Sequence, residues 1–166
     1  MTRMKVMAVP LRAAAGLVAL AIAAALTPGP PAVVNESPSL PRGLYVASAR
    51  EIGRGSVVML QQPDAARRYL VQLGFPAELP LLKRVGGLPG DPVCASPDAV
   101  RVAGRSARIL AADSRGTALP AWRGCRRLAH DELFLLGDSA ASFDSRYFGP
   151  VRVADVRGPY REVLTW

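Results

Sequence analysis

Residues 81–91 read LLKRVGGLPGD, an apolar run that carries a lysine and ends in a turn. The chain has 21 lysines and arginines, but only Lys5 and Lys83 are lysines. Arginine keeps its proton at any working pH, whereas a lysine buried among apolar side chains can lose its proton near neutral pH. Lys83 is therefore a candidate proton acceptor. A solvated lysine on a strand is the alternative interpretation of the same residue.

Short apolar stretches separated by glycine and proline surround this run. The chain holds 15 glycines and 15 prolines and is 50% hydrophobic, which favours a strand-rich fold over a helical bundle. We expect one helix from Asp64, its cap, to Leu73, followed by Gly74 and Pro76. Residues 32–41 are expected to be extended, and residues 111–127 to form an irregular loop. The expected strands are 43–47, 56–61, 81–88, 92–95, 99–102, 107–110, 132–136, 151–153 and 160–164.

The first 30 residues combine a basic start with an apolar run. Arg3, Lys5 and Arg12 precede an uncharged stretch from Ala13 to Leu26, which a proline-rich segment ends. This order predicts that the N-terminus stays in the cytoplasm and that the domain at residues 31–166 is exported. We expect a retained anchor, with Arg12 reaching the membrane surface, and a cleaved signal peptide is the alternative, because the length of the stretch is also typical of one. Either segment predicts a periplasmic domain, on the inner membrane if the anchor is retained.

Composition and motifs exclude several classes of function. The net charge is +8, but the basic residues are scattered and no nucleic-acid-binding motif accompanies them, so we expect no nucleic-acid partner. A Ser-His-Asp triad would have to use the single histidine, His130, but no serine of the chain lies in a G-x-S-x-G turn. The spacing of histidine and carboxylate residues does not suit a metal site either. A serine with a lysine base remains, and it needs no metal or cofactor.

Cys94 and Cys125 are the only cysteines. An even count in an exported protein predicts one disulfide between them. Two buried free thiols are the alternative.

Three stretches resemble the signature boxes of bacterial type I signal peptidases, and they occur in the family's order. They are NESPSLPRGLY (35–45), LLKRVGGLPGD (81–91) and LLGDSAASFDSRYFGPV (135–151). The first box departs from the housekeeping enzymes, which carry Ser-Met-x-Pro, because Pro41 follows Ser39 with only one residue between them. In this respect the chain resembles the conjugative-transfer peptidases of the TraF type. The resemblance implies a mainly β fold of coiled, partly barrel-like sheets with one short helix.

The resemblance also implies a role for each matching residue. Ser39 corresponds to the nucleophile and Lys83 to the general base. Ser37 corresponds to a hydroxyl that joins the Ser39 N–H in the oxyanion hole, although a serine that only caps a turn is the alternative.

The third box supplies the supporting residues. Ser142 corresponds to a serine that hydrogen bonds the lysine, and Gly137 and Asp138 form the turn before it. Asp144 and Arg146 correspond to an acid and a base that brace the wall of the site. In the TraF type the aspartate is itself implicated in activity, whereas a purely structural ion pair is the alternative.

The function implied is a membrane-associated serine endopeptidase with a Ser/Lys dyad. Its expected partners are the membrane and a membrane-tethered precursor protein, here a prepilin in conjugation, and its acyl-enzyme is resolved by water or by an amine that closes a ring. Two alternatives are a general secretory type I signal peptidase and an inactive, membrane-tethered basic binding module.

Overall fold

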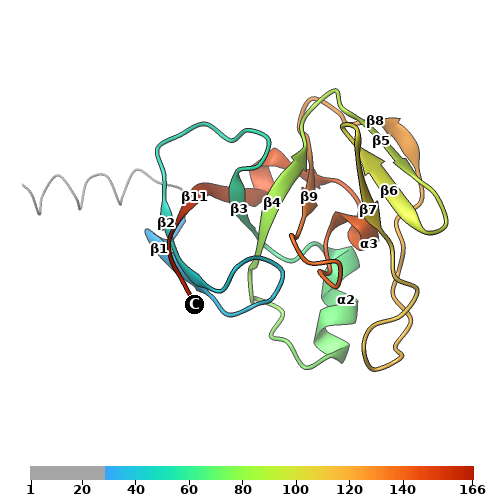
Figure 1. Cartoon of the computed structure of the whole chain (residues 1–166), viewed down its shortest axis with the longest axis horizontal. Helices are drawn as coiled ribbons and strands as arrows, with labels where there is room; N and C mark the ends of the chain where they lie inside the picture. The colour runs from blue at the N-terminus through green and yellow to red at the C-terminus, as the bar shows by residue number, and fades with distance from the viewer. Residues whose placement is uncertain (1–28) are drawn as a thin grey trace, which may run out of the picture.

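Seven strands form one curved antiparallel sheet in the computed structural model, which describes residues 29–166 (Figure 1). Their order is β1-β2-β11-β3-β4-β9-β10, so the C-terminal strand is inserted between two early ones. The strands are β1 (Ala32–Asn35), β2 (Gly43–Ala47), β3 (Val57–Leu60), β4 (Leu81–Gly87), β9 (Glu132–Leu136), β10 (Val151–Arg152) and β11 (Val156–Thr165).

A second antiparallel sheet stands beside the first (Figure 1). Its order is β7-β6-β5-β8, with β5 (Pro92–Ala95), β6 (Ala99–Val102), β7 (Arg105–Arg108) and β8 (Cys125–Arg127). Cys94 and Cys125 lie opposite each other on β5 and β8, and their sulfur atoms form a disulfide.

Strand β3 is apolar on both faces because each face packs into a different cluster of the core. Val58 and Leu60 of β3 belong to one buried cluster with Val85, whereas Val57 and Met59 belong to another cluster on the opposite face. Side chains alternate along a strand, and Lys83 pairs with Val58 and lies two residues before Val85. The lysine is therefore placed on the face of the first cluster, where water is excluded.

Within residues 29–166, three short helical segments complete the fold: α2 (Asp64–Gln72), α3 (Ser145–Phe148) and a 3-10 turn, η1 (Val153–Asp155). The buried face of α2 consists of Ala66, Tyr69 and Leu70. Asp64 is the first helical residue and not the predicted cap; its carboxylate lies 2.9 Å from Arg67 one turn later.

The mainly β prediction is confirmed, and the strands 43–47, 92–95, 99–102 and 132–136 have the predicted bounds. Residues 125–127 were predicted as loop but form β8, because they pair with β5. The strand predicted at 107–110 begins at Arg105, because Ala103 and Gly104 adopt positive φ angles of 49° and 79° and form a tight turn after β6.

Other differences lie at the ends of the sheet. Residues 32–35 of the extended segment pair with β2, and β11 begins at Val156, four residues before its predicted start. The helix α3 was not predicted. The predicted signal peptide or anchor lies outside the described residues, and among residues 29–166 no helix is long and apolar enough to cross a membrane.

Candidate active site

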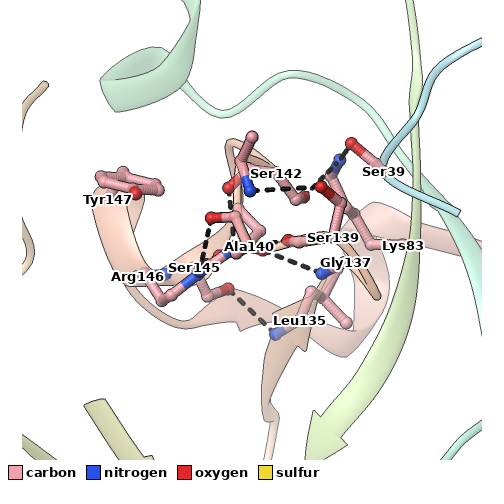
Figure 2. Close-up of polar contacts among 12 residues, drawn as sticks. Ser39, Lys83, Leu135, Gly137, Ser139, Ala140, Ser142, Ser145, Arg146 and Tyr147 are labelled. Carbon is pink, nitrogen blue, oxygen red and sulfur yellow. Dashed lines mark hydrogen bonds and ion pairs between the residues drawn. The ribbon is translucent and has the colours of Figure 1, made fainter. Parts of the chain in front are cut away.

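Lys83 and Ser39 meet where β4 passes the loop between β1 and β2. Lys83 Nζ lies 2.6 Å from Ser39 Oγ and 3.2 Å from Ser142 Oγ, and it hydrogen bonds both hydroxyls (Figure 2). All three residues are buried, with exposed fractions of 3%, 7% and 3% for Lys83, Ser39 and Ser142. The structure thus brings together residues from all three of the quoted boxes.

Burial changes the acidity of this lysine. Desolvation lowers the pKa of Lys83 from the ordinary 10.5 to about 8, because the charged amine loses its contact with water. The negative charge of Asp144 opposes this change, and the positive charge of Arg146 adds to it. A substantial fraction of Lys83 is therefore neutral in mildly alkaline solution, as a proton acceptor requires.

The loop that carries Ser39 is held by Asn35, at the end of β1. Its buried side-chain amide donates to the carbonyls of Ser37, Leu40 and Pro41 at 3.0–3.1 Å, and its carbonyl accepts from the Ser37 N–H. Asn35 was not predicted as a site residue. The signal was present, because an asparagine side chain commonly accepts a hydrogen bond from the backbone N–H two residues later and so closes a turn.

Ser37 is exposed, and its hydroxyl accepts a hydrogen bond of 3.1 Å from the Ser39 N–H. The two groups predicted for the oxyanion hole are therefore neighbours, but they are bonded to each other. To act together on a substrate oxygen, the Ser37 side chain has to rotate about χ1, which moves its oxygen away from the Ser39 N–H and lets the hydroxyl donate outward.

The turn after β9 closes the other side of the site. The N–H of Asp138 donates to the Ser39 carbonyl at 2.7 Å, which fixes the backbone of the serine. A Cβ added to Gly137 would overlap the Ser142 side chain and lie 2.8 Å from the Ser39 carbonyl oxygen. Only glycine fits at this position without displacing the hydroxyls that contact Lys83.

Asp144 and Arg146 form a buried ion pair beneath this turn, with N–O distances of 2.8 Å. The carboxylate also accepts from the Gly137 N–H at 2.8 Å. The guanidinium donates to the backbone carbonyls of Arg108, Ser139, Ala140 and Ser142. The pair therefore braces the turn, and Asp144 acts on Lys83 through its charge.

A second ion pair joins β4 to the same turn. Arg84 donates to both carboxylate oxygens of Asp138, at 2.9 and 2.7 Å. Arg84 was not predicted as a site residue, and nothing in its own strand indicates a partner some fifty residues away.

His130, excluded as a base from the sequence, is exposed in the turn before β9.

The family model described as "Signal peptidase, peptidase S26" matches residues 4–166. The chain belongs to the signal peptidase family. It is thus a peptidase, and the resemblance to this family is confirmed.

Relatives of this signal peptidase include conjugation proteins. A plasmid transfer protein TraF from Escherichia coli is 34% identical over 172 residues, which cover 93% of this chain and 97% of the relative. A conjugal transfer protein TraF from Agrobacterium tumefaciens (strain 15955) is 35% identical over 178 residues, or 94% of each chain. Among solved structures, a signal peptidase I from Enterococcus faecalis V583 is 25% identical with a TM-score of 0.42, over 71% of this chain and 100% of that chain.

The crowding at Gly137 gives a first prediction. Gly137→Ala should lower peptidase activity by roughly 10²-fold, because the methyl group displaces Ser39 and Ser142 from Lys83. The matched control is Gly53→Ala, since a Cβ at Gly53 meets nothing within 4 Å. Initial rates on a precursor peptide, with circular dichroism to verify folding, measure the effect. Wild-type activity in a folded Gly137→Ala protein would contradict the described crowding.

The pKa of Lys83 gives a second prediction, for stability. The unfolded chain keeps the proton of Lys83 up to about pH 10.5, whereas the folded chain releases it near pH 8, so this residue makes folding more favourable as the pH rises from about 8 to 10.5. Below pH 8 its burial costs up to roughly 3 kcal/mol.

Lys83→Met should therefore lose stability relative to wild type as the pH rises from 7 to 10.5, by up to about 3 kcal/mol, because only wild type gains stability over that range. Urea unfolding of both proteins across this range measures the difference, in which all other titrating groups cancel. A difference that stays constant from pH 7 to pH 10.5 would mean that Lys83 titrates alike in both states.

Proposed function

We propose that this signal peptidase is a serine endopeptidase in which Ser39 is the nucleophile and Lys83 the general base. The observation that carries the proposal is the 2.6 Å contact between Ser39 Oγ and a buried lysine amine whose pKa is lowered to about 8. Geometry and acidity agree here, since a general base must both reach the proton and be free to accept it.

The reaction follows from these contacts. Neutral Lys83 takes the hydroxyl proton as Ser39 Oγ attacks the peptide carbonyl carbon. The Ser39 N–H and the rotated Ser37 hydroxyl donate to the oxygen that becomes negative. The protonated amine then gives its proton to the leaving nitrogen as the C–N bond breaks, which leaves an ester on Ser39. A water molecule, deprotonated by Lys83, then attacks the ester, and Lys83 returns that proton to Ser39 Oγ as the ester C–O bond breaks and the acyl group leaves as a carboxylic acid. The free amine at the other end of the acylated segment can replace the water molecule, and the product is then a ring.

The supporting residues hold this arrangement. Ser142 keeps the Lys83 amine directed at Ser39, and the buried pair of Asp144 and Arg146 fixes the turn that carries Ser142. Removing one partner of a buried ion pair costs roughly 3–5 kcal/mol, so both residues matter for the site without touching the substrate.

For the substrate we propose an exported, membrane-tethered precursor, specifically a prepilin of a conjugation system. Relatives named for plasmid and conjugal transfer support this choice. Ser39 follows Leu26, the last residue of the apolar stretch, by 13 residues. That spacing suits a domain held on the periplasmic face of the inner membrane, close to where such a precursor is cut. An acyl-enzyme resolved by an amine would yield a ring.

The third prediction tests the dyad by one exchange. Lys83→Arg keeps the positive charge, but arginine does not release its proton at working pH, so cleavage should fall at least about 10³-fold. Ser39→Ala should be equally inactive, and the double variant no worse than either single variant, because the two groups act as one unit. Arg101→Lys, on the exposed face of β6, is the matched control and should stay active.

Cleavage of a purified prepilin followed by mass spectrometry measures these rates and also separates a linear product from a ring-closed one, which is lighter by one water. Substantial activity in a folded Lys83→Arg protein would end the dyad proposal.

A further inference from the structure

A cavity of about 460 Å³ lies beside the candidate active site, between the two sheets. Its walls are the edge strand β7, part of β4 and the turn after β9, which neighbour one another in Figure 1. Asp138 belongs to this wall and also donates its N–H to the Ser39 carbonyl at 2.7 Å. The cavity and the nucleophile therefore share one turn of the chain.

The cavity carries an excess of positive charge. Arg84, Arg105, Arg108 and Arg146 line it, with Asp138 as the one acidic lining residue. Arg84 is paired with Asp138, and Arg146 with Asp144. Within residues 29–166, no carboxylate forms an ion pair with Arg105 or Arg108, and both are exposed. Two guanidinium groups are thus available to an anionic ligand.

The backbone of β7 adds directed hydrogen-bonding groups. The Ile109 N–H donates to the Asp98 carbonyl, and hydrogen-bonded pairs alternate with non-bonded pairs along an antiparallel ladder. The backbone groups of Arg105 and Ala107 therefore bond β6. The backbone groups of Ser106 and Arg108 point away from β6, at the free edge of β7. The Arg108 carbonyl accordingly accepts from Arg146. The N–H groups of Ser106 and Arg108 and the Ser106 carbonyl form an open strand edge, which an extended peptide can pair with.

The position of the cavity indicates which part of a peptide would reach it. In the proposed reaction Lys83 gives its proton to the leaving nitrogen, so the segment after the cut emerges on the lysine side of Ser39. Gly137 and Ser142 lie on that side of the site, and Gly137 also lines the cavity.

We propose that this cavity binds acidic side chains in the extended segment that follows the cleaved bond. Arg105 and Arg108 pair with its carboxylates, and the free edge of β7 pairs with its backbone. The inference rests on the proposed function, which it deepens by stating a substrate preference.

The test uses two precursor peptides that differ only after the cut, one with glutamates and one with glutamines at the same positions. The variant is Arg105→Glu with Arg108→Glu, and the matched control is Arg101→Glu, an exposed arginine on β6 outside the cavity. The double variant should raise KM for the glutamate peptide about tenfold, with kcat unchanged, and leave the glutamine peptide unaffected. The control should match wild type, and high salt should reduce the preference of wild type.

Binding without cleavage separates this inference from the dyad. Both peptides are titrated into the Ser39→Ala protein and into a Ser39→Ala protein that also carries Arg105→Glu and Arg108→Glu, and fluorescence anisotropy measures the affinity. The glutamate peptide should bind the second protein about tenfold more weakly than the first. If Ser39→Ala still cleaves, the proposed function fails, and the intact fraction of each peptide still reports the charge preference.

Three results would overturn the inference. An equal change in KM for the glutamate and the glutamine peptide would mean that Arg105 and Arg108 have only a structural role. A preference that appears only when the glutamates precede the cut would place the cavity on the other side of the scissile bond. Loss of binding to phosphatidylglycerol vesicles with unchanged peptide KM would assign the cavity to the membrane surface.

Discussion

The arrangement of the candidate active site depends on the burial of one amine. Lys83 is buried in the large sheet, and its hydrogen-bonding partners are hydroxyl groups. A lysine in such a place is costly to keep charged, and that cost shifts the amine toward its neutral form. The apolar residues of β3 and β4 exclude water around it, and the loop of Ser39 closes over the amine. The burial that accompanies folding is therefore also what lowers the pKa of this amine.

The pairing of the nearby charges preserves this balance. A lone Asp144 would stabilise the protonated amine and raise its pKa, but Arg146 occupies both carboxylate oxygens and contributes an opposing charge. The same guanidinium holds four backbone carbonyls of neighbouring segments. One buried pair thus fixes the turn of Gly137 and Ser142 while adding little net charge near Lys83. This accounts for a carboxylate that acts on Lys83 through its charge without a hydrogen bond to the amine.

The parts that could be predicted from the sequence are those carried by local pattern. The scarcity of lysine singled out Lys83, the three boxes indicated Ser39 and Ser142, and alternating apolar residues marked most strands. Features made by distant pairing could not be predicted in the same way. The short strand β8 exists because β5 lies beside it, and Arg84 gains its role only where β4 meets the turn of Asp138. Likewise, the cavity beside β7 is formed by segments remote in sequence.

The central claim is that Lys83 has an unusually acidic amine, and the chain allows this to be measured directly. Lys5→Arg leaves Lys83 as the only lysine, so a protein labelled with ¹³C at the lysine ε-carbon gives one titrating NMR signal. Its chemical shift, followed from pH 6 to pH 12, reports the protonation of Lys83 alone. We expect a midpoint near the value of about 8 that burial produces. A midpoint at the ordinary lysine value of 10.5 would contradict the proposed role of Lys83 as a general base.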